Sequence, residues 1–83
     1  MKVVVNDVVE SSKYVGKVLE YQVVRKDIFS QQELVSDEVW HSIIKPSVDL
    51  KVFKPGAYVE IKKEVVKYED KDFWIISEAK EVK

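Results

Sequence analysis

Aromatic and basic side chains are the residues of this chain whose types are best suited to a function. The 83 residues include two tryptophans, four tyrosines and three phenylalanines. Proteins that bind single-stranded nucleic acid stack bases on exposed rings and hold the backbone with lysine and arginine. Phe29 is a candidate ring of this kind, and Lys67 is a candidate cation. The further candidate nucleic-acid-binding residues are Tyr21, Arg25, Lys26, Trp40, Lys45, Tyr58, Lys62, Tyr68 and Trp74.

Trp74 has two readings that depend on its strand. If Phe73 and Ile75 face inward, Trp74 shares an outer face with Glu78 and Lys80, and an outward tryptophan usually has a partner. In the other reading, Trp74 and Ile76 belong to the core, and the strand is covered on both faces. Tyr21 and Trp40 also suit a core, and the lysines near Glu60 and Glu64 suit a salt-bridged solvent face.

Catalytic and metal-binding chemistry has little support in the residue types. The chain has one histidine, no cysteine and no glycine-rich phosphate loop. His41 lacks a second histidine with which to hold a metal, and as a base it would need an orienting acid and a nucleophile. We expect a protein that is not an enzyme and that uses no cofactor or metal.

Composition and charge limit the class of protein. We expect one domain over residues 1–83, because this length leaves no room for a second. The net charge is −1, with −2 over residues 1–42 and +1 over residues 43–83, so neither half is a basic patch. Counterion release drives most non-specific nucleic-acid affinity, and this near-neutral balance weakens a nucleic-acid hypothesis. The apolar run at the N-terminus is too short for a signal peptide or a membrane span, so we expect a cytoplasmic protein. The lysine, glutamate and valine bias resembles that of heat-adapted proteins.

Strands dominate the expected secondary structure. Seventeen valines and six isoleucines against three leucines favour β-structure. Pro55-Gly56 predicts a turn, after which apolar and polar residues alternate from residue 57. Lys63-Glu64 breaks this alternation and indicates a bulge. We expect a loop at residues 69–72 and a partner strand over residues 73–79.

In the N-terminal third of the chain, the residue patterns predict less regular structure. Residues 3–5 suit a short edge strand, and Val18 to Val24 suit a longer one. Asp7 and Glu10 have the spacing of a capping box, and Gly16 suits the turn that follows or a loop approached by a ligand.

Residues 28–45 admit two interpretations with different folds. As a helix, Ser30 and Glu33 form a capping box, apolar residues fall on one face, and Pro46 ends the helix. As a hairpin, residues 29–36 and 39–45 are strands joined around Asp37-Glu38, although no Asn-Gly or Asp-Gly turn supports it.

Both ends of the chain resemble the oligonucleotide/oligosaccharide-binding (OB) family, in particular archaeal-type single-strand-binding and anticodon-binding domains. The resemblance rests on Asp7-Val8-Val9 with Tyr14-Val15-Gly16-Lys17, and on the segment from Lys54 to Ile61. It implies a mainly β fold, a small five-stranded barrel with one short helix near residues 47–53. The alternative is an α+β fold in which helix 30–45 packs on an antiparallel sheet.

The resemblance implies a module that binds single-stranded DNA or RNA through exposed aromatics and lysines. The alternative is a protein-interaction module, an accessory subunit or a small inhibitor, with no nucleic-acid affinity of its own. It follows from the near-neutral charge and from apolar strand edges that a partner could pair with, including a second copy in a homodimer.

Overall fold

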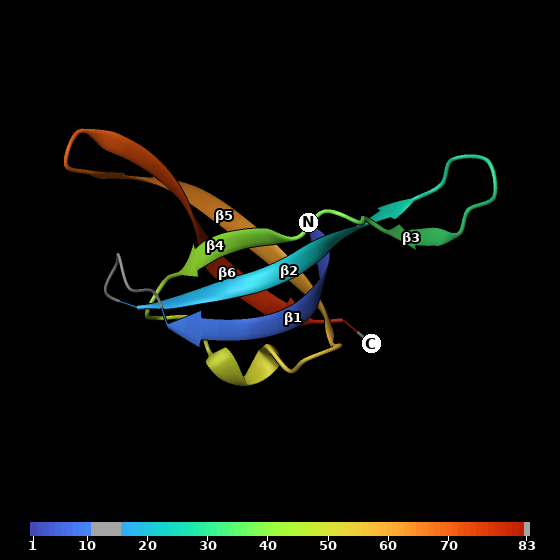
Figure 1. Cartoon of the computed structure of the whole chain (residues 1–83), viewed down its shortest axis with the longest axis horizontal. Coiled ribbons are helices and arrows are strands. Elements are labelled where there is room, and N and C mark those ends of the chain that lie inside the picture. Colours follow the sequence, from blue (N-terminus) through green and yellow to red (C-terminus); the bar gives the residue numbers. More distant parts are fainter. Residues whose placement is uncertain (11–15, 83) are drawn as a thin grey trace.

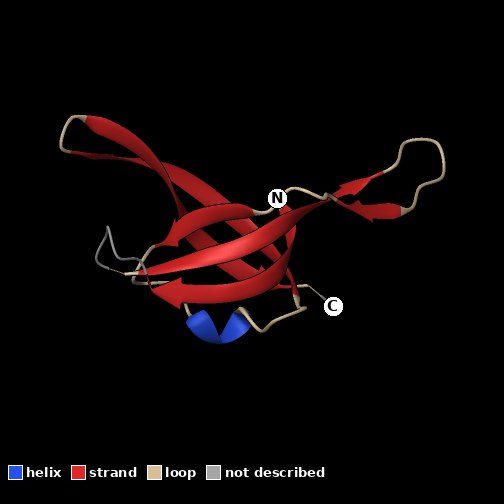
Figure 2. Ribbon diagram, viewed as in Figure 1, coloured by secondary structure: helices blue, strands red, loops and turns tan. Residues whose placement is uncertain are grey.

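The computed structural model describes residues 1–10 and 16–82, and this part of the chain is mainly β with one short 3-10 helix (Figures 1 and 2). In chain order the elements are β1 (Lys2–Glu10), β2 (Lys17–Lys26), β3 (Glu33–Val35), β4 (Trp40–Ile44), η1 (Leu50–Val52), β5 (Tyr58–Tyr68) and β6 (Lys71–Glu81). The expected mainly β class with one short helix is confirmed.

Five of the strands close into a ring. Their order is β1-β5-β6-β4-β2, and β2 pairs back onto β1. All neighbours in the ring are antiparallel except β4 and β6, which run parallel where Ile43 and Ile44 pair with Ile75 and Ile76. The sixth strand, β3, stands outside the ring and pairs with the distal end of β2. The ring therefore encloses an interior, as a small barrel does.

Two hairpins extend beyond the barrel. The β5–β6 arm comprises residues 65–74, and the β2–β3 arm comprises residues 24–35. Both rise on the side of the barrel that carries the N-terminus, toward opposite ends of the long axis, whereas η1 lies on the opposite side (Figure 1). The molecule consequently extends over 44 × 26 × 19 Å.

The core lies inside the ring and consists of alternate residues of its strands. These side chains are at most 5% exposed: Val3, Val5, Leu19, Tyr21, Ile44, Phe53, Val59, Ile61 and Ile76. Because side chains alternate between the two faces of a strand, one face of each ring strand supplies this interior. Phe53 follows η1, so the short helix brings an aromatic side chain to the end of the barrel opposite the arms.

The structure decides between the interpretations of residues 28–45, and both were wrong in part. No helix forms over 30–45, because β3 and β4 each pair with β2. The hairpin around Asp37-Glu38 is also wrong: β3 and β4 lie one after the other along the same edge of β2. The chain reverses instead at residues 27–32, where the backbone N–H groups of Asp27 and Gln31 donate to the carbonyls of Gln32 and Asp27. Pairing with β2 outweighs the local capping signals.

The N-terminal expectations need a second correction. Asp7 and Glu10 do not cap a helix but lie in β1, where they pair with Glu20 and Lys17 of β2. The short edge strand expected at residues 3–5 is a nine-residue strand that closes the ring. The described chain thus has six strands instead of five. Tyr14-Val15 of the family-like motif lies outside the described residues.

The hairpin of β5 and β6 matches its prediction. The Lys54 carbonyl accepts the Ala57 N–H across Pro55-Gly56, and Gly56 has a φ of 84°, as the third residue of a type II turn requires. The register shifts between Lys62 and Lys63. The extra residue lies on the partner strand, because Lys62 pairs with Glu78 and Lys63 pairs with Ile76, which leaves Ser77 as the bulge. The loop expected at 69–72 is narrower, since only Glu69 and Asp70 separate the strands.

Candidate functional site

The inner face of the barrel continues onto both arms, where no opposite strand covers it. On β5, the buried Val59 and Ile61 are followed on the same face by Lys63, Val65 and Lys67. On β2, the buried Tyr21 is followed by Val23 and Arg25. Their cross-strand partners lie on the same face. We call this surface the mouth face and define it by Arg25, Leu34, Trp40, Lys63, Val65, Lys67, Asp72 and Trp74.

Both tryptophans of the chain lie on the mouth face. Trp40 begins β4 opposite Tyr21 and is 49% exposed, and Trp74 lies opposite Val65 in the β5–β6 arm and is 63% exposed. They line one open depression of about 760 Å³, together with Met1, His41, Ser42, Ile61, Lys62 and Lys63. No carboxylate belongs to that lining. Two exposed indoles at one depression can stack planar groups.

Trp74 does not share a face with Glu78 and Lys80, contrary to the outward reading of β6. Trp74 lies on the same face as the buried Ile76 two residues on, and the bulge at Ser77 then reverses the alternation, so Glu78 and Lys80 lie on the opposite face. Trp74 is nevertheless exposed, because it lies in the β5–β6 arm, which extends beyond the barrel. Trp74 therefore lies on the face that the core reading expects, and it is exposed as the outward reading expects.

Lys63 is the cation most closely tied to the mouth. Its Nζ lies 5.2 Å from the centroid of the Tyr21 ring, a cation–π arrangement. It forms no ion pair with a carboxylate of the described chain. The sequence prediction missed Lys63, although its position two residues after Ile61 is the signal that could have found it.

Tyr21 needs a correction as a stacking residue. It is 1% exposed, and its hydroxyl forms a 2.9 Å hydrogen bond with Ser42 Oγ. A ring enclosed in this way cannot reach a base. It forms instead the floor on which Lys63 rests.

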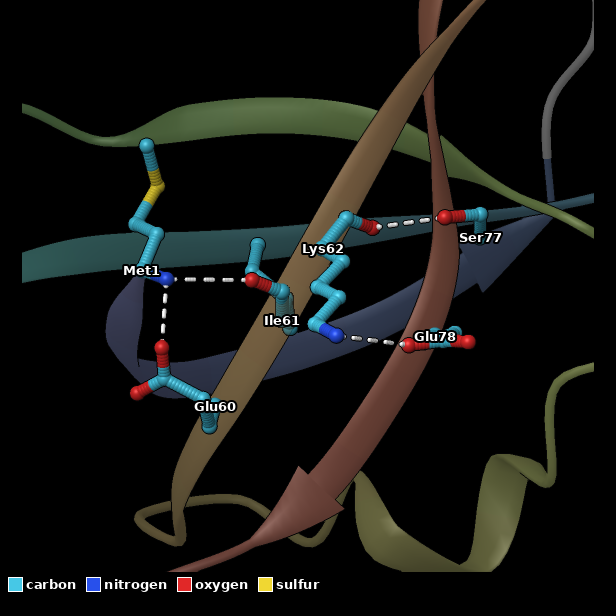
Figure 3. Close-up of polar contacts among 6 residues, drawn as sticks. All are labelled: Met1, Glu60, Ile61, Lys62, Ser77 and Glu78. Carbon is cyan, nitrogen blue, oxygen red and sulfur yellow. Dashed lines mark hydrogen bonds and ion pairs between the residues drawn. The ribbon is translucent and has the colours of Figure 1, made fainter.

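Lys62 borders the depression but is held from the other face of the hairpin. Its Nζ lies 3.4 Å from Glu78 Oε2, and its carbonyl accepts a 3.3 Å hydrogen bond from the hydroxyl of the bulge residue Ser77 (Figure 3). Nearby, the amino group of Met1 donates to Glu60 Oε1 at 2.6 Å and to the Ile61 carbonyl at 3.1 Å (Figure 3). Lys62 is thus partly neutralised.

The remaining predicted residues do not form one site. Arg25 lies on the mouth face of the β2–β3 arm, and Lys26 lies on the opposite face. Lys45 pairs with Glu64 at 3.2 Å on the outside of the barrel. Tyr58 lies at the start of β5, with Lys2 Nζ 5.3 Å from its ring centroid, and Tyr68 is exposed at the far end of the β5–β6 arm. Of the nine, Arg25, Trp40 and Trp74 belong to the mouth face, and Lys62 borders it.

Acidic residues gather on other surfaces. A second depression of about 450 Å³ contains Asp49, Glu60 and Glu78 in its lining. The outer face of β1 and β2 carries Asp7 and Glu20, and Glu20 Oε1 lies 3.2 Å from Nε2 of His41. Among the eight residues that define the mouth face, Asp72 is the single acid against three cations. The near-neutral charge of the whole chain therefore conceals a locally basic surface.

Metal and membrane features were also searched for in the described residues. No group of three or more His, Asp or Glu side chains there is placed to hold a metal ion. No helix within residues 1–10 and 16–82 is long and apolar enough to cross a membrane. Comparison with known proteins adds no relative: the chain matches no protein-family model, no curated protein and no solved structure at a significant level.

Proposed function

We propose that this chain is an OB-type module that binds single-stranded nucleic acid on its mouth face. The observation that carries the proposal is the coincidence of both tryptophans, Lys63 and Lys67 on one uncovered surface from which all acids but Asp72 are absent. In such a site, the indoles stack bases and the cations contact phosphates, which together give affinity without reading sequence.

The strand arrangement supports the OB part of the proposal. A five-stranded barrel is the architecture of that family, and its face and loops carry oligonucleotide binding. In the ring, three strands are followed by a short helix and then by two strands, as the resemblance implies. The two arms supply additional uncovered surface on either side of the barrel mouth (Figure 2).

The first test is a tryptophan-fluorescence titration with an unstructured oligothymidylate of about 16 nucleotides, at the upper end of OB site sizes. Because the chain has only Trp40 and Trp74, any quenching reports directly on the mouth face. We expect quenching that weakens between about 50 mM and about 200 mM salt. Trp74→Ala should weaken binding by about 1–3 kcal/mol, the contribution of one stacked base.

Lys63→Gln separates the phosphate contacts from stacking. Each phosphate contact with a single strand contributes about 0.7 to the slope of log affinity against log salt, so this variant should lose about that much slope. Leu50→Ala is the control for Trp74→Ala, because Leu50 is a 40% exposed apolar side chain on η1, away from the mouth face. No quenching at high oligonucleotide concentration and low salt would exclude the proposed function.

A protein-interaction module is the second candidate, and the β5–β6 arm favours it. On β5, residues 65–68 pair with β6 alone among the described strands, so the β5 side of the arm has a free edge. The arm also exposes Val65, Val66 and Tyr68. A second copy that added a strand to this edge would form a homodimer. Light scattering after size exclusion tests this candidate, since it predicts a dimer that Val66→Lys dissociates.

A further inference from the structure

The tip of the β2–β3 arm holds two large apolar side chains in solvent. Ile28 is 79% exposed and Phe29 is 91% exposed, the two highest values among the exposed large hydrophobic residues. The loop between β2 and β3, which carries both residues, lies at one end of the molecule's long axis (Figure 1). Exposed apolar residues gathered at one place usually mark a contact surface.

A hydrogen-bonded turn holds the tip in one conformation. Asp27 Oδ1 accepts the Phe29 N–H at 3.0 Å, and Asp27 Oδ2 accepts the Ser30 hydroxyl at 2.9 Å. The hydrogen bond from the Phe29 N–H, and after it the one from the Ser30 hydroxyl, hold the pKa of Asp27 below its usual range. The Gln31 side chain also donates to the Ile28 carbonyl at 3.2 Å. A tip fixed in this way loses little conformational entropy when its apolar side chains contact a ligand.

The arm that carries the tip is continuous with the mouth face and bears cations. Arg25 and Leu34 pair across the arm on its mouth side, and Lys26 follows directly. Neither Arg25 nor Lys26 forms an ion pair with a described residue. A nucleic-acid strand on the mouth face that continued along this arm would meet Arg25 and then the apolar tip, whereas Lys26 lies on the opposite face of the arm.

We propose that Ile28 and Phe29 stack on the last base pair of a duplex at a junction between single and double strands, while the single strand lies on the mouth face. The inference rests on the proposed function and narrows its substrate class. One exposed ring suffices to stack a single base, whereas two adjacent apolar side chains can cover the broader end of a base pair. Phenylalanine and isoleucine are side chains that proteins use as wedges against base steps. Arg25 would contact a phosphate beside the junction.

The test compares two probes by fluorescence anisotropy: the oligothymidylate alone, and the same oligothymidylate joined to a hairpin duplex at its 5′ or its 3′ end. The wild-type protein should bind one of the junctions about tenfold more tightly (about 1.4 kcal/mol) than the single strand. Phe29→Ala should abolish this preference and leave single-strand affinity unchanged. Trp74→Ala should weaken the binding of both probes.

The outcomes distinguish the two proposals. If neither probe binds, the proposed function fails and the junction inference fails with it. If the single strand binds but neither junction is preferred, or if the preference survives in Phe29→Ala, only the junction inference fails. The junction inference also fails if Phe29→Ala weakens binding to anionic phospholipid vesicles and changes the binding of neither probe, because the tip would then contact a membrane surface. Leu50→Ala is the matched control for loss of an exposed apolar side chain, and circular dichroism confirms that each variant is folded.

Discussion

Tyr21 connects the core of this protein to its candidate site at the scale of single residues. Its ring lies inside the barrel beneath Lys63, and its hydroxyl bonds to Ser42, which is 8% exposed. The hydrogen bond satisfies two polar groups that burial would otherwise make costly. The same side chain thus stabilises the barrel and supports a cation at the mouth.

Tyr21→Phe separates these two roles. The variant leaves the Ser42 hydroxyl without its partner, so we expect a loss of about 1–2 kcal/mol in the free energy of unfolding. Lys63 keeps an aromatic ring beneath it, so oligonucleotide affinity should stay close to wild type. Urea unfolding measures the first quantity and the fluorescence titration measures the second. The double variant Tyr21→Phe with Ser42→Ala is the control, since it removes both polar groups and should recover part of the lost stability.

The two turns that flank β5 differ in how well their residues suit the backbone. Gly56 occupies a position with a φ of 84°, which glycine adopts without strain. Glu69 and Asp70 have φ values of 48° and 64°, the pair of positive angles that a type I′ hairpin turn requires and that asparagine followed by glycine accepts best. The β5–β6 arm therefore ends in a turn that is not optimal for stability.

Replacing Glu69-Asp70 with Asn-Gly should stabilise this hairpin. We expect a gain of about 0.5–1 kcal/mol in the free energy of unfolding, because glycine adopts the left-handed conformation without strain and asparagine tolerates it better than glutamate does. Gly56→Ala is the opposite control. No atom lies within 4 Å of the position its Cβ would take, so backbone strain alone should destabilise that variant. Thermal unfolding of both variants measures the effect, and melting temperatures equal to that of the wild-type protein would contradict it.

The described molecule divides into a barrel, whose strands pair on both sides, and two arms, each of which is a two-stranded hairpin. In the ring, β1, β2 and β5 contribute the buried Val3, Leu19 and Val59, whereas residues 65–68 and 71–74 contribute none to the core. Local stability follows burial and hydrogen bonding. The mouth face therefore lies largely on the less stable part of the fold.

Hydrogen exchange should show this division directly. We expect slow exchange at the core positions of β1, β2 and β5 in the ring, and faster exchange over residues 65–74 and 24–35, because the arms open without disrupting the core. Binding of the oligothymidylate should slow exchange in the arms more than in the barrel. Uniform protection across the chain would show that the arms are not independent of the barrel.

Particular residues show which features could be read without the fold. Alternation from residue 57 and the Pro55-Gly56 turn predicted the β5–β6 hairpin, because a half-buried strand needs a period of two and this turn needs glycine. The break at Lys63-Glu64 predicted the position of the register shift. It could not show that Ser77 is the extra residue, since a bulge depends on two strands and the alternation of one strand does not reveal the other.

The sequence by itself determined the bias toward strands, the β5–β6 hairpin and the aromatic residues that were candidates for binding, because these depend on side-chain type and on short-range periodicity. The tertiary structure alone decided that β3 and β4 both pair with β2, that Tyr21 is buried while Trp40 and Trp74 share one surface, and that Asp72 is the single acid among the residues that define the mouth face. Strand pairing brings together residues far apart in the chain, and the side of a strand that is covered depends on where its neighbours end. Neither property is contained in the local pattern of residues.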